Sequence, residues 1–155
     1  ADGIKDPRNK FLQSLQDNLG EKGDIIVYNQ PFEKMVLKQG SEFSPIFSGW
    51  YYENILPRIK DLMVVFNDFN YYNPKQKGSI SIKSVLPVLS NLSYSDLEIR
   101  KGDVAQFEFD RITYGSVSEE ERKKVRLALE KYCELDTLAE VEIINGLRNL
   151  IKEKN

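Results

Sequence analysis

The sequence predicts an α/β fold that is rich in helix. Two helical patterns flank a short β-branched run near the N-terminus, and the links between them are short. A long, capped helical pattern occupies the C-terminal part of the chain. The order helix, strand, helix is typical of layered α/β architectures. Because no repeat or linker interrupts the 155 residues, we expect a single domain over 1–155.

Local signals predict the first three elements. Asp6 can cap a helix whose first position suits Pro7, and Gly20 ends the apolar pattern that follows. The β-branched run 24–28 predicts a buried strand. The turn at 29–31 then leads into a second helix with apolar residues at helical spacing.

The middle of the chain is dense in aromatic residues between 49 and 73. Within it, the segment 55–59 predicts the end of a helix, and the run from Leu62 to Phe66 predicts a second strand. The segment 73–78 combines Pro, Gly and Lys, which indicates a basic loop.

Three further helices are predicted in the C-terminal half. The first begins near Ser81, and after an irregular stretch a second covers 104–114. The third runs over 118–152, where Ser118 and Glu121 form a capping-box pattern.

The chain contains no histidine and one cysteine, Cys133. A Ser-His-Asp or Cys-His nucleophile, a structural zinc site and a disulfide framework are therefore excluded within these residues. Asp, Glu, Lys and Tyr remain for acid–base or metal chemistry, and their oxygen atoms favour Mg²⁺ or Mn²⁺. The lack of disulfides makes a reducing compartment the default, so we expect a cytoplasmic protein.

Composition also bears on partners. The formal charge of -2 argues against a general nucleic-acid-coating protein, but it is compatible with a nuclease, whose site is itself acidic. No apolar run approaches the length of a membrane span, so no membrane partner is expected.

Asp136 interrupts an apolar stripe on the last predicted helix. Leu129, Cys133, Ala139 and Ile143 lie on the same face by steps of three and four residues. A buried carboxylate is costly without a partner. One alternative is that a hydroxyl or a backbone N–H donates a hydrogen bond to the Asp136 carboxylate. The other is that Asp136 is a metal ligand, with the phenol of Tyr132 beside it one turn earlier on the helix.

Glu33 is a second candidate, because it lies in the first helical turn after the strand predicted at 24–28. In α/β folds, ligands bind beyond the carboxyl ends of strands. A carboxylate at that place can also simply complement the helix N-terminus.

Both candidates lie in segments that resemble one enzyme family. Tyr132 and Asp136 fit the Tyr-x-x-x-Asp third motif of DnaQ-like 3′–5′ exonucleases of the tyrosine (DEDDy) type, and Asn29 to Glu33 resembles their second motif, Asn-x-x-Phe-Asp, with Glu33 replacing aspartate. The chain is more closely similar to a bacterial family of uncharacterised proteins predicted to contain such domains. The strings that carry this likeness are Asp6-Pro7-Arg8, Val27-Tyr28-Asn29, Phe32-Glu33-Lys34, Arg58 to Leu62, Lys77 to Lys83, Val85-Leu86-Pro87, Ser93-Tyr94, Leu97-Glu98-Ile99 and Tyr132 to Ala139.

The resemblance implies an RNase H-like fold and phosphodiester hydrolysis with two Mg²⁺ or Mn²⁺ ions. Asp136 would be a metal ligand, Glu33 would take the role of the second-motif carboxylate, and Tyr132 would orient or deprotonate the attacking water. The implied partner is a single-stranded DNA or RNA end. The candidate contacts to such a partner are Asn29, Phe32, Tyr71, Tyr72, Lys77, Ser79 and Lys83.

The aromatic and basic-loop candidates are chosen from their own residue types, and each has a simpler alternative. Aromatic residues such as Tyr71 and Tyr72 can stack bases, but they are more often packing anchors. The segment from Lys77 to Ser79 can meet a phosphate through its backbone N–H groups, or it can be a plain surface turn.

The first motif of the family, Asp-x-Glu on the first strand, is missing. The only Asp-x-Glu here, at 96–98, follows the second motif and is out of order. The resemblance therefore implies the C-terminal portion of an RNase H-like domain without its first strands, inactive alone and open to self-association through the incomplete sheet. The alternative is a non-catalytic RNase H-like module that binds nucleic acid or a protein.

Overall fold

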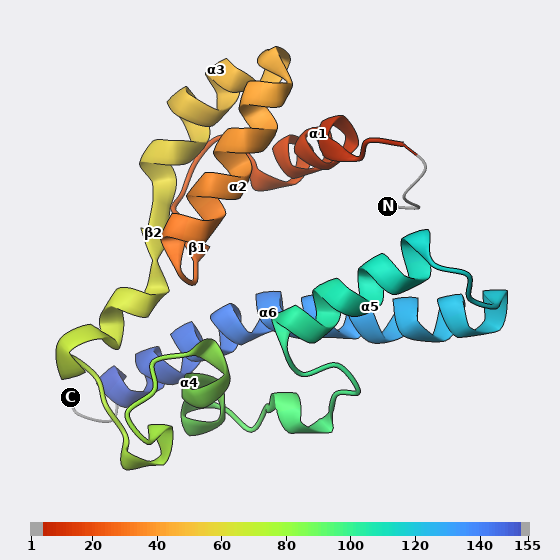
Figure 1. Cartoon of the computed structure of the whole chain (residues 1–155). Coiled ribbons are helices and arrows are strands. Elements are labelled where there is room, and N and C mark those ends of the chain that lie inside the picture. The colour runs from red at the N-terminus through yellow and green to blue at the C-terminus, as the bar shows by residue number, and fades with distance from the viewer. Residues whose placement is uncertain (1–4, 153–155) are drawn as a thin grey trace. The chain divides into compact units, whose positions relative to one another are not determined.

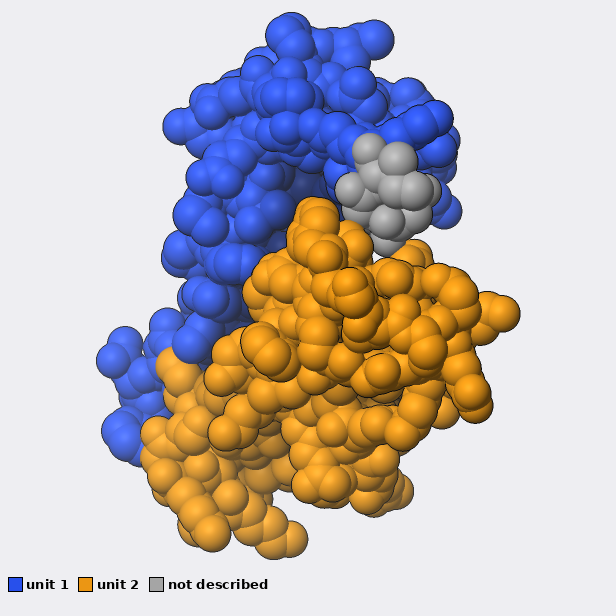
Figure 2. Space-filling view, turned by 45° about the vertical axis from the view of Figure 1, so that its right-hand side comes forward, with its two compact units in different colours: residues 1–70 blue, residues 71–155 orange. Residues whose placement is uncertain are grey.

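The structure is a computed structural model that describes residues 5–152. The chain forms two compact units, residues 1–70 and residues 71–155, which Figure 2 colours blue and orange. The first unit combines helices with two short strands, and the described part of the second is built from helices and loops. The helix-rich α/β class is confirmed at this general level.

The first unit begins with the helix, strand and helix that the sequence predicts (Figure 1). Gly20 ends the first helix with a φ of 57°, a left-handed conformation that glycine adopts without strain. The elements of this unit are α1 (Arg8–Leu19), β1 (Ile25–Val27), α2 (Gln30–Phe43), a 3-10 turn (Pro45–Phe47), α3 (Ser48–Trp50), a π-helical turn (Tyr51–Ile55), a 3-10 turn (Leu56–Arg58), β2 (Ile59–Asp61) and two further 3-10 turns (Leu62–Val65 and Asn67–Phe69).

The two strands of the first unit pair in parallel. Ile25 lies opposite Ile59 and Val27 opposite Asp61. Parallel neighbours need a long crossover, which α2 and the helical turns after it supply. Val27, Ile59, Tyr51 and Ile55 form a buried cluster that joins the sheet to the crossover.

The strand predicted from Leu62 to Phe66 is wrong. The strand lies immediately before it, at Ile59–Asp61, and Leu62–Val65 is a 3-10 turn. The reason is Asp61, whose carboxylate accepts a hydrogen bond from the backbone N–H of Met63 at 2.9 Å. This contact caps the 3-10 turn and ends the strand, although the residues that follow are apolar and β-branched.

The second unit is organised around one long helix. Its elements are a 3-10 turn (Pro74–Gln76), α4 (Ile82–Leu89), a 3-10 turn (Tyr94–Asp96), α5 (Gly102–Tyr114) and α6 (Glu119–Lys152) (Figure 1). Both α4 and α5 pack against α6. At Gly146 the backbone of α6 approaches α4 so closely that an added Cβ would lie 2.5 Å from the carbonyl oxygen of Leu89.

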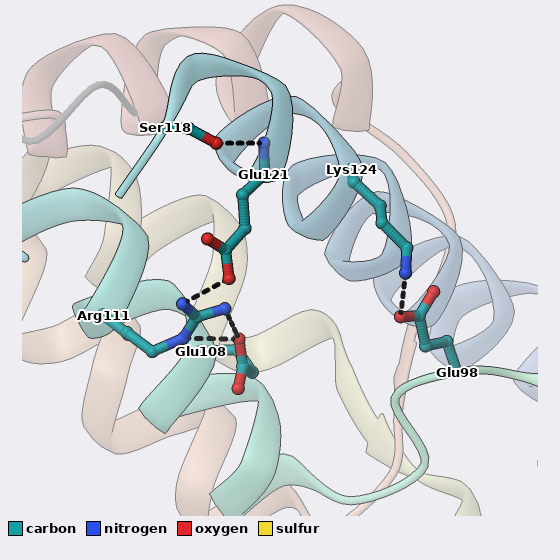
Figure 3. A network of polar contacts seen from close by, with 6 residues as sticks. All are labelled: Glu98, Glu108, Arg111, Ser118, Glu121 and Lys124. Carbon is teal, nitrogen blue, oxygen red and sulfur yellow. Dashed lines mark hydrogen bonds and ion pairs between the residues drawn. The ribbon is translucent and has the colours of Figure 1, made fainter. Parts of the chain in front are cut away.

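Half of the predicted capping box of α6 is formed. The Ser118 hydroxyl accepts a hydrogen bond from the backbone N–H of Glu121 at 3.2 Å. The Glu121 carboxylate instead accepts from Arg111 of α5 at 2.7 Å, and Arg111 also donates to Glu108 at 2.8 Å (Figure 3). The side chain that the pattern assigns to the cap therefore ties α5 to the start of α6.

Candidate functional site

Tyr132 and Asp136 lie one turn apart on α6, as their spacing predicts. Tyr132 is buried, with 8% of its surface exposed, and Asp136 is half-buried. Ala139 and Ile143 continue the same face as buried residues. Cys133, which the sequence pattern places on the stripe, is exposed because the buried face passes through Tyr132.

Tyr94 reaches the Asp136 carboxylate from outside α6. It lies in the 3-10 turn Tyr94–Asp96, whose start is capped by the Ser93 hydroxyl. The Tyr94 side chain is 4% exposed, and its hydroxyl donates a hydrogen bond to Asp136 Oδ1 at 2.6 Å. This distance is typical of a strong bond from a hydroxyl to a charged oxygen. Tyr94 thus supplies the hydroxyl that is expected if Asp136 is a buried carboxylate held by a hydrogen bond.

Lys83 approaches Tyr132 from the first turn of α4, where Ser81 caps the helix. Its ammonium donates a hydrogen bond to the Tyr132 hydroxyl oxygen at 3.2 Å. The same Nζ lies 5.1 Å from the ring centroid of Tyr132 and 5.2 Å from that of Tyr94. Both distances are within the range of cation–π attraction. We call Lys83, Tyr94, Tyr132 and Asp136 the tyrosine–aspartate cluster.

Burial keeps the two phenols of the cluster protonated. Burial raises the pKa of Tyr132 to about 12, and the neighbouring Asp136 charge adds to the rise. The pKa of Tyr94 is raised further, first by burial and then by its hydrogen bond to Asp136. At neutral pH both tyrosines therefore offer an O–H group rather than a phenolate.

The second-motif candidates belong to the first unit. Glu33 lies in the first turn of α2, and Phe32 beside it is 54% exposed. Asn29 precedes the helix with a φ of 73°, a left-handed conformation that asparagine tolerates better than most residues. The structure thus places Glu33 at a helix N-terminus, directly after a strand, as the sequence predicts.

Asp61 organises this end of the first unit, a role that the strand prediction missed. Its Oδ1 accepts from the backbone N–H of Asn29 at 3.1 Å, and its Oδ2 accepts from that of Gln30 at 3.0 Å. With the bond from Met63, one carboxylate joins the end of β1, the start of α2 and the turn after β2. Asp61 therefore occupies the anion position at the α2 N-terminus.

The remaining predicted nucleic-acid contacts lie at the start of the second unit. Lys77 is exposed and Tyr72 is 40% exposed, whereas Tyr71 is half-buried. The Ser79 hydroxyl oxygen accepts bonds from the Ser84 hydroxyl at 3.0 Å and from a backbone N–H at 3.2 Å. Ser79 thus supports the entry to α4 through these two hydrogen bonds.

The described residues supply suitable atoms for Mg²⁺ or Mn²⁺ but not a complete ligand set. Asp136 offers carboxylate oxygen, which these ions prefer. Within residues 5–152, however, no group of three or more His, Cys, Asp or Glu side chains is placed to hold a metal ion.

No helix within the described range 5–152 is both long and apolar enough to cross a membrane.

Comparisons with known proteins give relatives over nearly the whole chain. It is 29% identical over 160 residues to Uncharacterized protein MG366 of Mycoplasma genitalium, covering 94% of this chain and 24% of that protein. It is likewise 29% identical over 162 residues to the MG366 homolog of Mycoplasma pneumoniae, covering 96% and 24%. The chain thus spans about a quarter of the length of these curated relatives. No solved structure matches it.

One family model matches residues 1–81, more than half of the sequence, and its description is Domain of unknown function (DUF2779). The match covers the whole first unit and continues to Ser81, the cap of α4. The chain therefore belongs to the DUF2779 family.

Proposed function

We propose that this chain contributes part of the catalytic centre of a metal-dependent 3′–5′ exonuclease of the DnaQ-like, RNase H-like type. The observation that carries the proposal is the tyrosine–aspartate cluster. Tyr132 and Asp136 have the spacing of the third exonuclease motif, and the two side chains lie together against Tyr94 and Lys83. The proposed substrate is the 3′ end of single-stranded DNA or RNA.

Within this proposal, Asp136 contributes carboxylate oxygen toward a magnesium or manganese ion, and Glu33 is the second-motif carboxylate. Bound metal would supply activation of water and stabilisation of the leaving oxygen. Tyr132 orients the attacking water as a hydrogen-bond donor. Because its pKa is raised to about 12, it is a poor general base at neutral pH.

The proposal requires further carboxylates from the complete gene product. The 155 residues contain no Asp-x-Glu motif ahead of Asn29, so this chain alone is expected to lack nuclease activity. The chain covers 24% of each curated relative, which leaves ample length for an Asp-x-Glu motif.

A second candidate function is a non-catalytic module that binds nucleic acid or a protein. The bond from Tyr94 to Asp136 favours it, because it gives the half-buried carboxylate a structural partner within the chain. An Asp-x-Glu motif ahead of these residues in the complete gene favours the enzyme, and its absence favours the binding module.

The test measures cleavage of a 3′-labelled single strand by the complete gene product with Mg²⁺ or Mn²⁺. We expect stepwise loss of the label, abolished by chelator and lowered about a hundredfold or more by Tyr132→Phe. Tyr114→Phe is the matched control, since Tyr114 is 74% exposed on α5. A complete protein that leaves the strand intact, or a Tyr132→Phe variant that cleaves at the wild-type rate, contradicts the proposal.

A further inference from the structure

The tyrosine–aspartate cluster contains two residues that the exonuclease motifs do not assign. Tyr94 lies outside both motifs, and Lys83 is predicted from the resemblance only as a contact to nucleic acid. The structure directs both side chains at Tyr132 and Asp136.

Lys83 sets the direction of the Tyr132 hydroxyl. A lysine ammonium has only donors, so the Tyr132 oxygen must be the acceptor of their 3.2 Å hydrogen bond. The phenolic proton then points away from Lys83, and Asp136, whose hydrogen bond helps to raise the pKa of Tyr132, is the acceptor beside it. Contacts with two aromatic faces, at 5.1 and 5.2 Å, hold the ammonium in this place.

Tyr94 sets the orientation of the Asp136 carboxylate. Its hydroxyl takes one lone pair of Oδ1 at 2.6 Å, and its ring, packed 6.1 Å from that of Tyr132, is almost fully buried. A carboxylate has about four lone-pair sites, so this bond restrains the position of Oδ1 and leaves acceptor capacity for a ligand. A rigid, buried phenol is well suited to hold a catalytic carboxylate in one rotamer.

We infer that Lys83 and Tyr94 are positioning residues, which fix the donor direction of Tyr132 and the orientation of Asp136. The inference rests on the proposed function and extends it to two residues outside the motifs. It also changes the expected role of Lys83, whose ammonium serves Tyr132 rather than a substrate phosphate.

The first test observes the contacts without any catalysis. In the 155-residue chain, the NMR signals of the Tyr132 ring are compared among wild type, Lys83→Met, Lys83→Arg and Tyr94→Phe. We expect Lys83→Met and Tyr94→Phe to shift the ring signals, and Lys83→Arg to restore part of the wild-type position. Lys123→Met, on the exposed face of α6, should leave them unchanged.

The second test measures cleavage kinetics of the complete gene product with the same variants. We expect Tyr94→Phe and Lys83→Met to lower kcat about a hundredfold while KM stays near the wild-type value, and Lys83→Arg to recover part of kcat. A higher KM with normal kcat in Lys83→Met would place Lys83 on substrate phosphate and overturn the inference.

The two tests separate failure of the inference from failure of the proposed function. Ring signals that do not move in Lys83→Met and Tyr94→Phe overturn the inference, whatever the activity. A wild-type protein with no nuclease activity refutes the proposed function, and shifted signals in that case identify the contacts as structural, which overturns the positioning role as well.

Discussion

Replacing Asp61 should lower the stability of the first unit. Its carboxylate accepts three backbone N–H bonds, from Asn29 at 3.1 Å, Gln30 at 3.0 Å and Met63 at 2.9 Å. A hydrogen bond contributes about 1 kcal/mol net to stability, so Asp61→Ala should lower the free energy of unfolding by about 3 kcal/mol. Asp61→Asn keeps one acceptor oxygen and should cost about 1 to 2 kcal/mol.

The assay uses the single tryptophan of the chain, Trp50, which lies in α3 of the first unit. Its fluorescence during urea denaturation reports the first unit, while most of the α-helical residues that give the circular dichroism signal belong to α4, α5 and α6 of the second unit. Asp24→Ala is the matched control, because Asp24 is exposed and precedes β1. A fluorescence midpoint that moves no further in Asp61→Ala than in Asp24→Ala would refute the role of this carboxylate.

Three other outcomes follow from the structure. Arg58 donates to four backbone carbonyls in and after the end of α1, at 2.7 to 3.1 Å, so Arg58→Lys should lower the stability of the first unit by about 2 kcal/mol in urea denaturation. Gly146→Ala should destabilise the second unit by about 1 to 3 kcal/mol, because the new Cβ would clash with the Leu89 carbonyl. The clash should outweigh the better helix propensity of alanine. Thermal unfolding followed by circular dichroism measures the loss of stability. Burial raises the pKa of Tyr51 above its ordinary value of 10.0 in the folded state. The contribution of the protonated Tyr51 side chain to folding stability is therefore complete below pH 10, and it is lost as pH rises toward the folded-state pKa. Trp50 fluorescence should therefore give a urea midpoint that falls above pH 10, with a shallower fall in Tyr51→Phe.

Contrary results would be equally clear. An Arg58→Lys midpoint equal to that of the wild type would make the four carbonyl contacts energetically unimportant. A stabilised Gly146→Ala variant would show that α4 moves aside at low cost. An alkaline fall of the same steepness in Tyr51→Phe would assign the pH dependence to other groups.

The sequence predicts the helices well because their signals are local. Capping residues such as Ser81 and Ser118 and the terminator Gly20 act on their own turns, and the structure uses all three. The strand prediction at Leu62 failed because the Asp61 carboxylate caps a 3-10 turn through Met63. The same carboxylate also bonds to Asn29 and Gln30, more than 30 positions away, and no local pattern contains those contacts.

The candidate site could be predicted only in part for the same reason. The spacing of Tyr132 and Asp136 on one helix is a local property and is visible in the sequence. Tyr94 is 42 positions from Asp136, and Lys83 is 49 from Tyr132, so their contacts depend on how three elements pack. A tyrosine beside a capping serine, as in Ser93-Tyr94, gives no sign of such a partner.

The most direct test of the account is the cleavage rate of the complete gene product carrying Asp136→Asn, compared with Glu134→Gln on the exposed side of the same helix turn. If Asp136 belongs to a catalytic centre, Asp136→Asn abolishes release of a 3′ label in Mg²⁺ or Mn²⁺ while Glu134→Gln retains the wild-type rate. Equal rates for the two variants would contradict it, because Asp136 would then be a structural partner of Tyr94 and no part of a catalytic centre.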